Sequence, residues 1–492
     1  MFNGEIKFHS QTAVLLRSTG QNNPTSARQP YGPARFLTVV LCMTLLFLAC
    51  PAAAALPPGQ TAVLDAIQSQ LDSTPYFPEA QVIHPDQDAV LPGDMASPHI
   101  VWKDSFFMSD TWLVRLKLAC GKCVYHLTRN SAWVPDKTVW DQVKKGAAGR
   151  PVMIEIIGFN RNKNCRVITR TQRRIHISKD RFDALILFKS TPLPFHKSKA
   201  NPGLSSWRIG DIAAHHPPRV VMEGLTTCAH CHRFSANAGY LGMDIDHNND
   251  KGGYLVTRIR PEMRLTRDQY FSWNAFKGFG PDSMGLFSTL SPDGRWIAAT
   301  VNEISLFAMF NNRMYSQLFF PIAGKIAVYD RQKKNAFHLS GADRDDRVQT
   351  CPEFSPDGRS LVFAASPRNP ALLNAMKGRK YLSPAPGETI AHFNQRFPIR
   401  FNLYRQPFRD GKGGTAMPLK GASQNGKSNY FPRYSPDGKW IIFCQSSTGL
   451  VLQPDSRLHV IKAVGGTARP LSCNTGQMNS WHCFTPNGRW VI

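Results

Sequence analysis

The chain has 492 residues, of which 42% are hydrophobic and 19% charged, and its formal net charge is +25. The length allows two or three domains, and the composition excludes an intrinsically disordered protein. Glycine and proline occur 36 times each, which predicts many turns and mainly β structure. The positive charge favours acidic proteins or anionic lipid as partners but does not indicate a fold.

An apolar run near the N-terminus predicts export. Residues 36–49, FLTVVLCMTLLFLA, follow Arg35 and precede CPAAAALPPG, the pattern of a basic n-region, an apolar core and a small-residue cleavage site. The run is shorter than the ~20 residues of a membrane-spanning helix, and retention as a membrane anchor is the alternative. We therefore assign residues 1–55 to an export signal and expect the protein in the periplasm or cell envelope, without nucleic acid as a partner.

The next segment combines one helical pattern with several strand patterns. TAVLDAIQSQL (61–71) predicts a helix, and alternating apolar residues predict strands at 99–104, 111–119, 152–159 and 173–179. In the second strand, Trp112, Val114 and Leu116 share one face, which predicts a strand buried on that face only. Short strands with a core tryptophan predict an immunoglobulin-like β-sandwich over 77–200, and a β domain of another topology is the alternative.

A cysteine motif follows in residues 226–234, TTCAHCHRF. Cys228, Cys231 and His232 have the Cys-x-x-Cys-His spacing of c-type haem proteins, in which both thiols add to haem vinyl groups and the histidine ligates the iron. The motif predicts haem c, attached at Cys228 and Cys231, with His232 as the proximal ligand. The alternatives are a disulfide beside an incidental histidine, or half of a zinc site completed by Cys120 and Cys123.

Several side chains could occupy the opposite face of the iron. Met243, in YLGMDID, lies 11 residues after His232 and is our preferred distal ligand, although methionine in a strand is usually a core residue. The alternatives are His215, His216, His247 or an open site.

An acidic run overlaps this segment. In DIDHNNDKGG (244–253), Asp244, Asp246, Asn248 and Asp250 occupy alternate positions and offer oxygen ligands for Ca²⁺. The glycine spacing does not match an EF-hand loop, and a solvated turn is the simpler interpretation.

One pattern then recurs four times: LSPDGRWIAAT (290–300), FSPDGRSLVFAAS (354–366), YSPDGKWIIFCQS (434–446) and FTPNGRWVI (484–492). Proline presets φ, the acidic or amide side chain accepts from the backbone, and glycine takes the positive φ of the turn. A repeated hairpin of this kind predicts a β-propeller over 251–492. RFSANAGYLGMDI (233–245) is a degenerate copy, which places the haem motif in a first blade within 201–250. The chain stops inside a strand, so we expect a truncated propeller.

From about residue 77 onward, the chain resembles a family of bacterial exported proteins that combine a TolB-like β-propeller with one c-type haem motif. MEGLTTCAHCHRFS, LGMDIDHNNDKGGY, NLYRQPFRDGKGG, SNYFPRYSPDGKWIIFCQ and CNTGQMNSWHCFTPNGRW carry the resemblance. It implies an envelope haem protein with Cys228 and Cys231 as attachment points and His232 as the proximal ligand. The chain departs from the family in SANAG, where relatives have a fuller Asp-Gly turn. No substrate comes with the resemblance.

Taken together, these features predict an all-β, exported c-type haem protein that serves in electron transfer or haem-based sensing. An acidic redox or envelope protein is the expected partner, and an anionic membrane surface is a second one. The alternative is a propeller that binds proteins and has structural disulfide or zinc cysteines without a redox role. An enzyme ranks third, because the sequence contains neither a G-x-S-x-G elbow nor an H-E-x-x-H motif.

Overall fold

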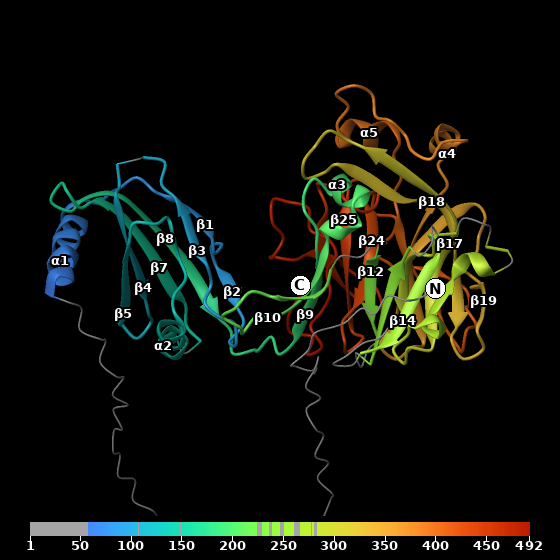
Figure 1. Cartoon of the computed structure of the whole chain (residues 1–492), viewed down its shortest axis with the longest axis horizontal. Coiled ribbons are helices and arrows are strands. Elements are labelled where there is room, and N and C mark those ends of the chain that lie inside the picture. The colour runs from blue at the N-terminus through green and yellow to red at the C-terminus, as the bar shows by residue number, and fades with distance from the viewer. Residues whose placement is uncertain are drawn as a thin grey trace, which may run out of the picture. The chain divides into compact units, whose positions relative to one another are not determined.

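The computed structural model describes residues 58–106, 108–147, 149–223, 229–235, 239–246, 250–259, 266–276, 278–279 and 283–492. Over these residues the protein is mainly β, as predicted (Figure 1). They form two compact units: an N-terminal unit of 58–182 with Ile212–His216, and a C-terminal unit of Asp183–Asp211 and Pro217–Ile492. In this described part, no helix is long and apolar enough to cross a membrane, and the apolar run 36–49 lies outside it.

A five-stranded sheet forms the centre of the N-terminal unit. Its strands, in spatial order, are β2 (Ala89–Leu91), β8 (Arg166–Ile177), β7 (Val152–Asn160), β4 (Thr111–Lys117) and β5 (Cys123–Thr128). The β2–β8 pair is parallel and the other pairs are antiparallel. A smaller sheet contains β1 (Gln81–His84), β3 (Ile100–Lys103) and β6 (Ala132–Trp133). The helices are α1 (Pro58–Ser73), which confirms the helix predicted at 61–71, and α2 (Lys137–Ala147).

Both faces of the five-stranded sheet are covered. On one face, Val114 packs in a cluster with Trp102 of β3 and Trp140 of α2. On the other face, Leu113 packs in a cluster with Ile67 of α1. Figure 1 shows α1 and the β1–β3 pair on opposite sides of this sheet.

This covering corrects two predictions. β4 is not buried on one face only, because α1 shields the face that carries Leu113 and Arg115. An immunoglobulin-like sandwich consists of two antiparallel sheets. This unit has a mixed sheet, with α1 on one face and both α2 and the smaller sheet on the other, so the structure does not show the immunoglobulin-like sandwich predicted for 77–200.

A buried carboxylate lies on the α1 face of the sheet. Glu155 of β7 has no exposed side-chain surface, and it accepts hydrogen bonds from Arg115 Nε at 2.6 Å and Arg170 Nε at 2.9 Å. Lys117 Nζ lies 3.0 Å from the same carboxylate, and Arg115 also donates to Gln68 of α1. Three cations therefore share one carboxylate beneath the helix.

The described residues of the C-terminal unit form four antiparallel meanders of four strands each, which we call blades 1 to 4 because β-propeller blades have this form. Blade 1 contains β12 (Ala229–Phe234), β13 (Tyr240–Ile245), β14 (Gly253–Arg258) and β15 (Tyr270–Ser272). Blade 2 contains β16 (Leu286–Leu290), β17 (Trp296–Met309), β18 (Gln317–Asp330) and β19 (Asn335–His338). Blade 3 contains β20 (Arg347–Phe354), β21 (Ser360–Pro367), β22 (Asn402–Pro407) and β23 (Met417–Pro418). Blade 4 contains β24 (Ser428–Tyr434), β25 (Trp440–Ser446), β26 (Arg457–Lys462) and β27 (Arg469–Pro470).

The repeated Pro-Asp-Gly segment joins the first strand of a blade to the second, which confirms the predicted hairpins. In blade 3, Ser355 Oγ accepts from Ser360 N at 2.9 Å, and Asp357 Oδ1 accepts from Arg359 N at 3.0 Å. Gly358 has φ 69°, as the turn requires. Equivalent bonds form in blades 2 and 4 and in the last copy, where Phe484 bridges to Val491. The degenerate copy in blade 1 keeps the bond from Tyr240 N to Ser235 Oγ.

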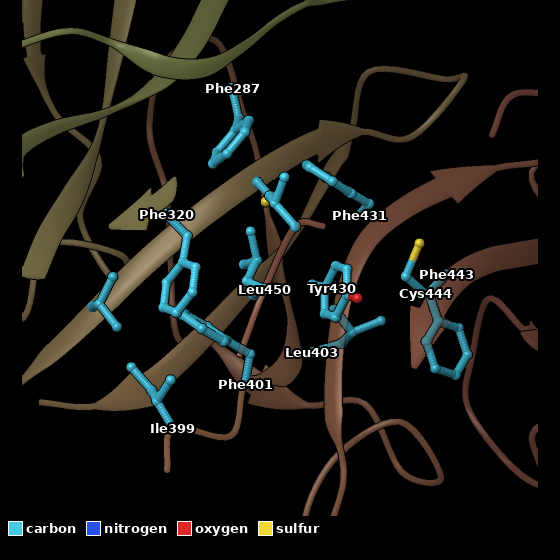
Figure 2. Close-up of a cluster of buried hydrophobic side chains, with 14 of the residues drawn as sticks. Phe287, Phe320, Ile399, Phe401, Leu403, Tyr430, Phe431, Phe443, Cys444 and Leu450 are labelled. Carbon is cyan, nitrogen blue, oxygen red and sulfur yellow. The ribbon is translucent and has the colours of Figure 1, made fainter. Parts of the chain in front are cut away.

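The main core of this unit lies around blades 2 to 4. Figure 2 shows Phe320 of β18, Leu403 of β22 and Tyr430 of β24 in one buried cluster with Phe401. Strands β17 and β18 extend beyond the blade, and Leu306 of β17 belongs to the cluster that also includes residues of α4 (Pro370–Met376) and α5 (Ile390–Arg396). Outside the blades are α3 (Phe195–Ala200) and a three-stranded sheet of β9 (Leu185–Ser190), β10 (Ser206–Asp211) and β11 (Arg219–Met222).

Candidate functional site

The predicted haem motif lies at the start of blade 1. Cys228 is outside the described residues, whereas Cys231 and His232 lie on β12, although the side chain of Cys231 is not described. β12 pairs Ala229 with Ile245 and His232 with Met243, so three steps along β12 match two along β13. This extra residue is a β-bulge, which interrupts the strict alternation of side chains that a regular strand imposes.

The imidazole of His232 projects from β12 and packs against neighbouring aromatic residues. Its ring centroid lies 4.5 Å from that of Trp207, edge to face, and its Nε2 lies 3.3 Å from the carbonyl oxygen of Leu187. Burial, and secondly the charge of Arg233, lowers the pKa of His232 to about 4. The ring is therefore neutral at physiological pH, which is the form that binds a metal ion.

His232 also lines a cavity of about 1560 Å³. The first strand of every blade contributes to its wall, through Arg233 and Phe234 of β12, Phe287 and Leu290 of β16, Glu353 and Phe354 of β20, and Arg433 and Tyr434 of β24. The prolines of the repeated turns line it as well. The first strands therefore converge on one space, as they do around the channel of a propeller. This space exceeds the ~300–1,000 Å³ of ordinary small-molecule sites.

Four equivalent residues of the repeat line this cavity, and the fifth, Thr289, contacts one of them. The position two residues before the serine or threonine of each turn is occupied by Arg233, Thr289, Glu353, Arg433 and Cys483, which we call the inner ring. Arg433 Nη1 donates to Glu353 Oε2 at 3.0 Å, and Thr289 Oγ1 donates to the same oxygen at 3.3 Å. Sequence reasoning missed the inner ring, although its constant distance from the repeated turn was a usable signal.

Burial changes the acid–base properties of the inner ring. It raises the pKa of Glu353 to about 7, against the opposing effects of Arg233 and Thr289. Cys483 is exposed as a residue, but the protein atoms around its thiol raise its pKa, so the thiol stays protonated at neutral pH. Among the described residues, Arg233 has a buried Nε without a hydrogen-bond partner, and so does Arg433.

Met243, the predicted distal ligand, lies next to His232 across the β12–β13 pair. It is 2% exposed and belongs to an apolar cluster with Trp207 and Leu255. This location is that of a core residue, and the ligand assignment stays a prediction. Of the alternative ligands, His215 and His216 are exposed and belong to the N-terminal unit, and His247 lies outside the described residues.

The acidic run is engaged within the protein. Asp246 pairs with Lys251, and Asp250 accepts from Tyr270 Oη at 2.9 Å and from Asn274 Nδ2 at 2.8 Å. Asn248 is not among the described residues. Over the residues that are described, no three His, Cys, Asp or Glu side chains gather as a metal site.

The seven cysteines that the structure describes fully are free thiols: Cys120, Cys123, Cys165, Cys351, Cys444, Cys473 and Cys483. Cys120 and Cys123, the other half of the alternative zinc site, are exposed and half-buried respectively, in the N-terminal unit.

Comparison with known proteins gives only distant similarities. No known family profile matches the chain, and no curated protein matches its sequence. Hydrazine synthase from Kuenenia stuttgartiensis aligns with 70% of this chain and 88% of its own, at 10% identity and a TM-score of 0.32. A prolyl endopeptidase covers 56% of this chain and 32% of its own, at 12% identity and a TM-score of 0.27. A putative dipeptidyl aminopeptidase IV from Bacteroides ovatus covers 84% and 57%, at 12% identity and a TM-score of 0.23. These similarities are too weak to assign a family or an activity.

Proposed function

We propose that the protein is an exported c-type haem protein in which blade 1 of a TolB-like propeller carries haem c. Cys228 and Cys231 attach the haem, and His232 is the proximal ligand of the iron. The observation that carries the proposal is the location of His232: a half-buried imidazole, neutral at physiological pH, lies on the wall of a large cavity and is next to Cys231 in the sequence.

The surroundings of His232 fit a haem. The Nε2 atom lies within hydrogen-bonding distance of the Leu187 carbonyl, which leaves Nδ1 for a metal ion. Such a second bond fixes the tautomer of a ligating histidine and raises its basicity. Trp207 and Phe234 provide aromatic surface next to the ring. When bound, haem c supplies a one-electron redox centre.

Ligation by Met243 would require a local change in the structure. It is the direct cross-strand partner of His232, so both side chains point to the same face of the sheet with Cβ atoms ~4.5–5.5 Å apart. If haem c is bound, His232 and Met243 would hold it together only if β12 and β13 separated at this pair, because side chains this close leave no room for a macrocycle between them.

The role that we propose is electron transfer or haem-based sensing in the cell envelope. The net charge of +25 favours an acidic redox or envelope protein as partner and permits contact with an anionic membrane surface. Such attraction weakens as the ionic strength rises, because salt screens exposed charges.

The motif is tested by cysteine replacement in the full chain, produced with bacterial haem-attachment machinery. Cys228→Ser with Cys231→Ser should abolish covalent haem, whereas the matched pair Cys120→Ser with Cys123→Ser should retain it. His232→Ala should keep the haem attached but change the absorption spectrum of the iron. If the wild-type protein is folded and exported but colourless, the propeller is better explained as a protein-binding module with structural cysteines.

A further inference from the structure

We propose that the inner ring binds a small oxyanion, a carboxylate or phosphate group, through Arg233 and Arg433. Arg233 directly follows His232, but the site uses none of Cys228, Cys231 and His232 and does not require haem to be present.

The repeat itself brings the two arginines together. Arg233 and Arg433 hold the same position relative to the turn in blades 1 and 4, and both line the cavity. Both charges act on Glu353 of blade 3: Arg433 forms an ion pair with it at 3.0 Å, and the charge of Arg233 opposes the rise in its pKa that burial causes. Because three blades each supply one charged residue, the site exists only in the folded propeller.

The charges of the inner ring are not balanced. Two guanidinium groups face one carboxylate, and only Arg433 is paired with it among the described residues. Arg433 is 6% exposed, and its Nε is buried without a hydrogen-bond partner, as is Nε of Arg233. A buried N–H group of an ion that lacks an acceptor is costly. A planar or tetrahedral oxyanion satisfies such groups, since guanidinium binds carboxylate and phosphate in a bidentate manner.

The other members of the inner ring, Thr289, Glu353 and Cys483, are compatible with the binding of an oxyanion. Thr289 and Arg433 hold the Glu353 carboxylate, which keeps Arg433 extended into the cavity. Burial already disfavours the charged form of Glu353, whose pKa is raised to about 7, so its repulsion of a second anion is reduced. Cys483 adds a neutral thiol.

A carboxylate or phosphate group could reach this site from two sources. One is a free anion in solution. The other is a propionate group of the haem, and this second source depends on the proposed function. The full chain with Cys228→Ser and Cys231→Ser, which lacks covalent haem, separates them. Calorimetric titration of this variant with inorganic phosphate and with acetate, at fixed pH and ionic strength, measures the free site. The same titration of the wild-type haem protein shows whether the site is already filled.

Four further substitutions, one of them a control, test the site. Arg233→Gln should weaken phosphate or acetate binding by about tenfold or more, the effect of losing a charged hydrogen bond. Arg233→Lys should restore part of that affinity, and Glu353→Gln should increase it by removing a negative charge. Arg409→Gln, at an exposed arginine outside the cavity, should leave the affinity unchanged.

Binding to both forms identifies a free anion. Binding only to the haem-free variant, with a shifted haem potential in Arg233→Gln, identifies the propionate. The proposal is overturned if Arg233→Gln matches Arg409→Gln in anion affinity and in haem potential. Anion binding by a protein that never acquires haem would leave this inference intact and refute the proposed function alone.

Discussion

Replacing Glu155 by glutamine removes the charge that three cations share beneath α1. Glutamine keeps the shape of the side chain but leaves Arg115, whose side chain is 11% exposed, without a counter-ion. Removing one partner of a buried ion pair costs about 3–5 kcal/mol. Arg170 and Lys117 are 30% and 36% exposed and regain water, so we expect the lower end, about 3 kcal/mol.

The pH dependence of this loss follows from the pKa of Glu155. Burial raises it, but hydrogen bonds from Gln172 and Lys117 and the charge of Arg115 outweigh burial and lower it from 4.5 to about 2. A carboxylate whose pKa is lower in the folded state stabilises the fold above its unfolded pKa, and this contribution is lost as the pH falls toward the folded value. The difference between wild type and Glu155→Gln should therefore be constant above pH 5 and shrink below it.

Hydrogen exchange provides the assay, because it reports β4, β7 and β8 separately from the blades. At pH 7, peptides from these strands should lose protection in Glu155→Gln. Asp141→Asn, which breaks surface pairs with Lys137 and Lys144, is the control and should change little. The reasoning is refuted if Glu155→Gln resembles this control at pH 7, or if its deficit persists in full when urea unfolding is measured at pH 3.

Gly358→Ala should cost about 1–2 kcal/mol of unfolding free energy, since φ is 69° and the nearest atom to the new Cβ is 3.8 Å away. Gly294→Ala in the equivalent turn should cost more, because its Cβ would lie 2.6 Å from the Tyr240 ring; equal costs in urea unfolding would contradict this packing. Burial raises the pKa of Glu303 to about 7, so ionisation opposes folding as the pH rises from 4.5 to 7, and Glu303→Gln should gain stability over wild type between pH 5 and 8 in paired melting curves. Met243→Leu should change stability by less than about 1.5 kcal/mol. In the oxidised haem protein it should remove the near-infrared band of methionine ligation, and an unchanged band would show Met243 to be a core residue only.

The blades could be predicted from the sequence because their turns are specified locally. Serine, aspartate and glycine at fixed spacing make their hydrogen bonds within six residues, so the hairpin at Ser355 depends little on distant contacts. Even the degenerate copy at Ser235 keeps the bond that closes the turn.

The features that could not be predicted from the sequence depend on contacts between distant segments. The alternation in β4 identified one apolar face, but the cover on the other face comes from α1, about 45 residues earlier. The inner ring was missed for the same reason: Arg233 and Arg433 are 200 positions apart and line one cavity only when the blades converge. Burial, which makes His232 neutral, is likewise a tertiary effect.

Covalent attachment of haem is the most direct test of the proposed function. The full-length protein, made with haem-attachment machinery and then denatured, should retain haem absorbance on the polypeptide and show an intact mass increased by one haem. Tandem mass spectrometry should place that haem on the peptide containing Cys228 and Cys231. A folded, exported protein whose mass is that of the polypeptide alone, with both thiols free or joined in a disulfide, would contradict the account.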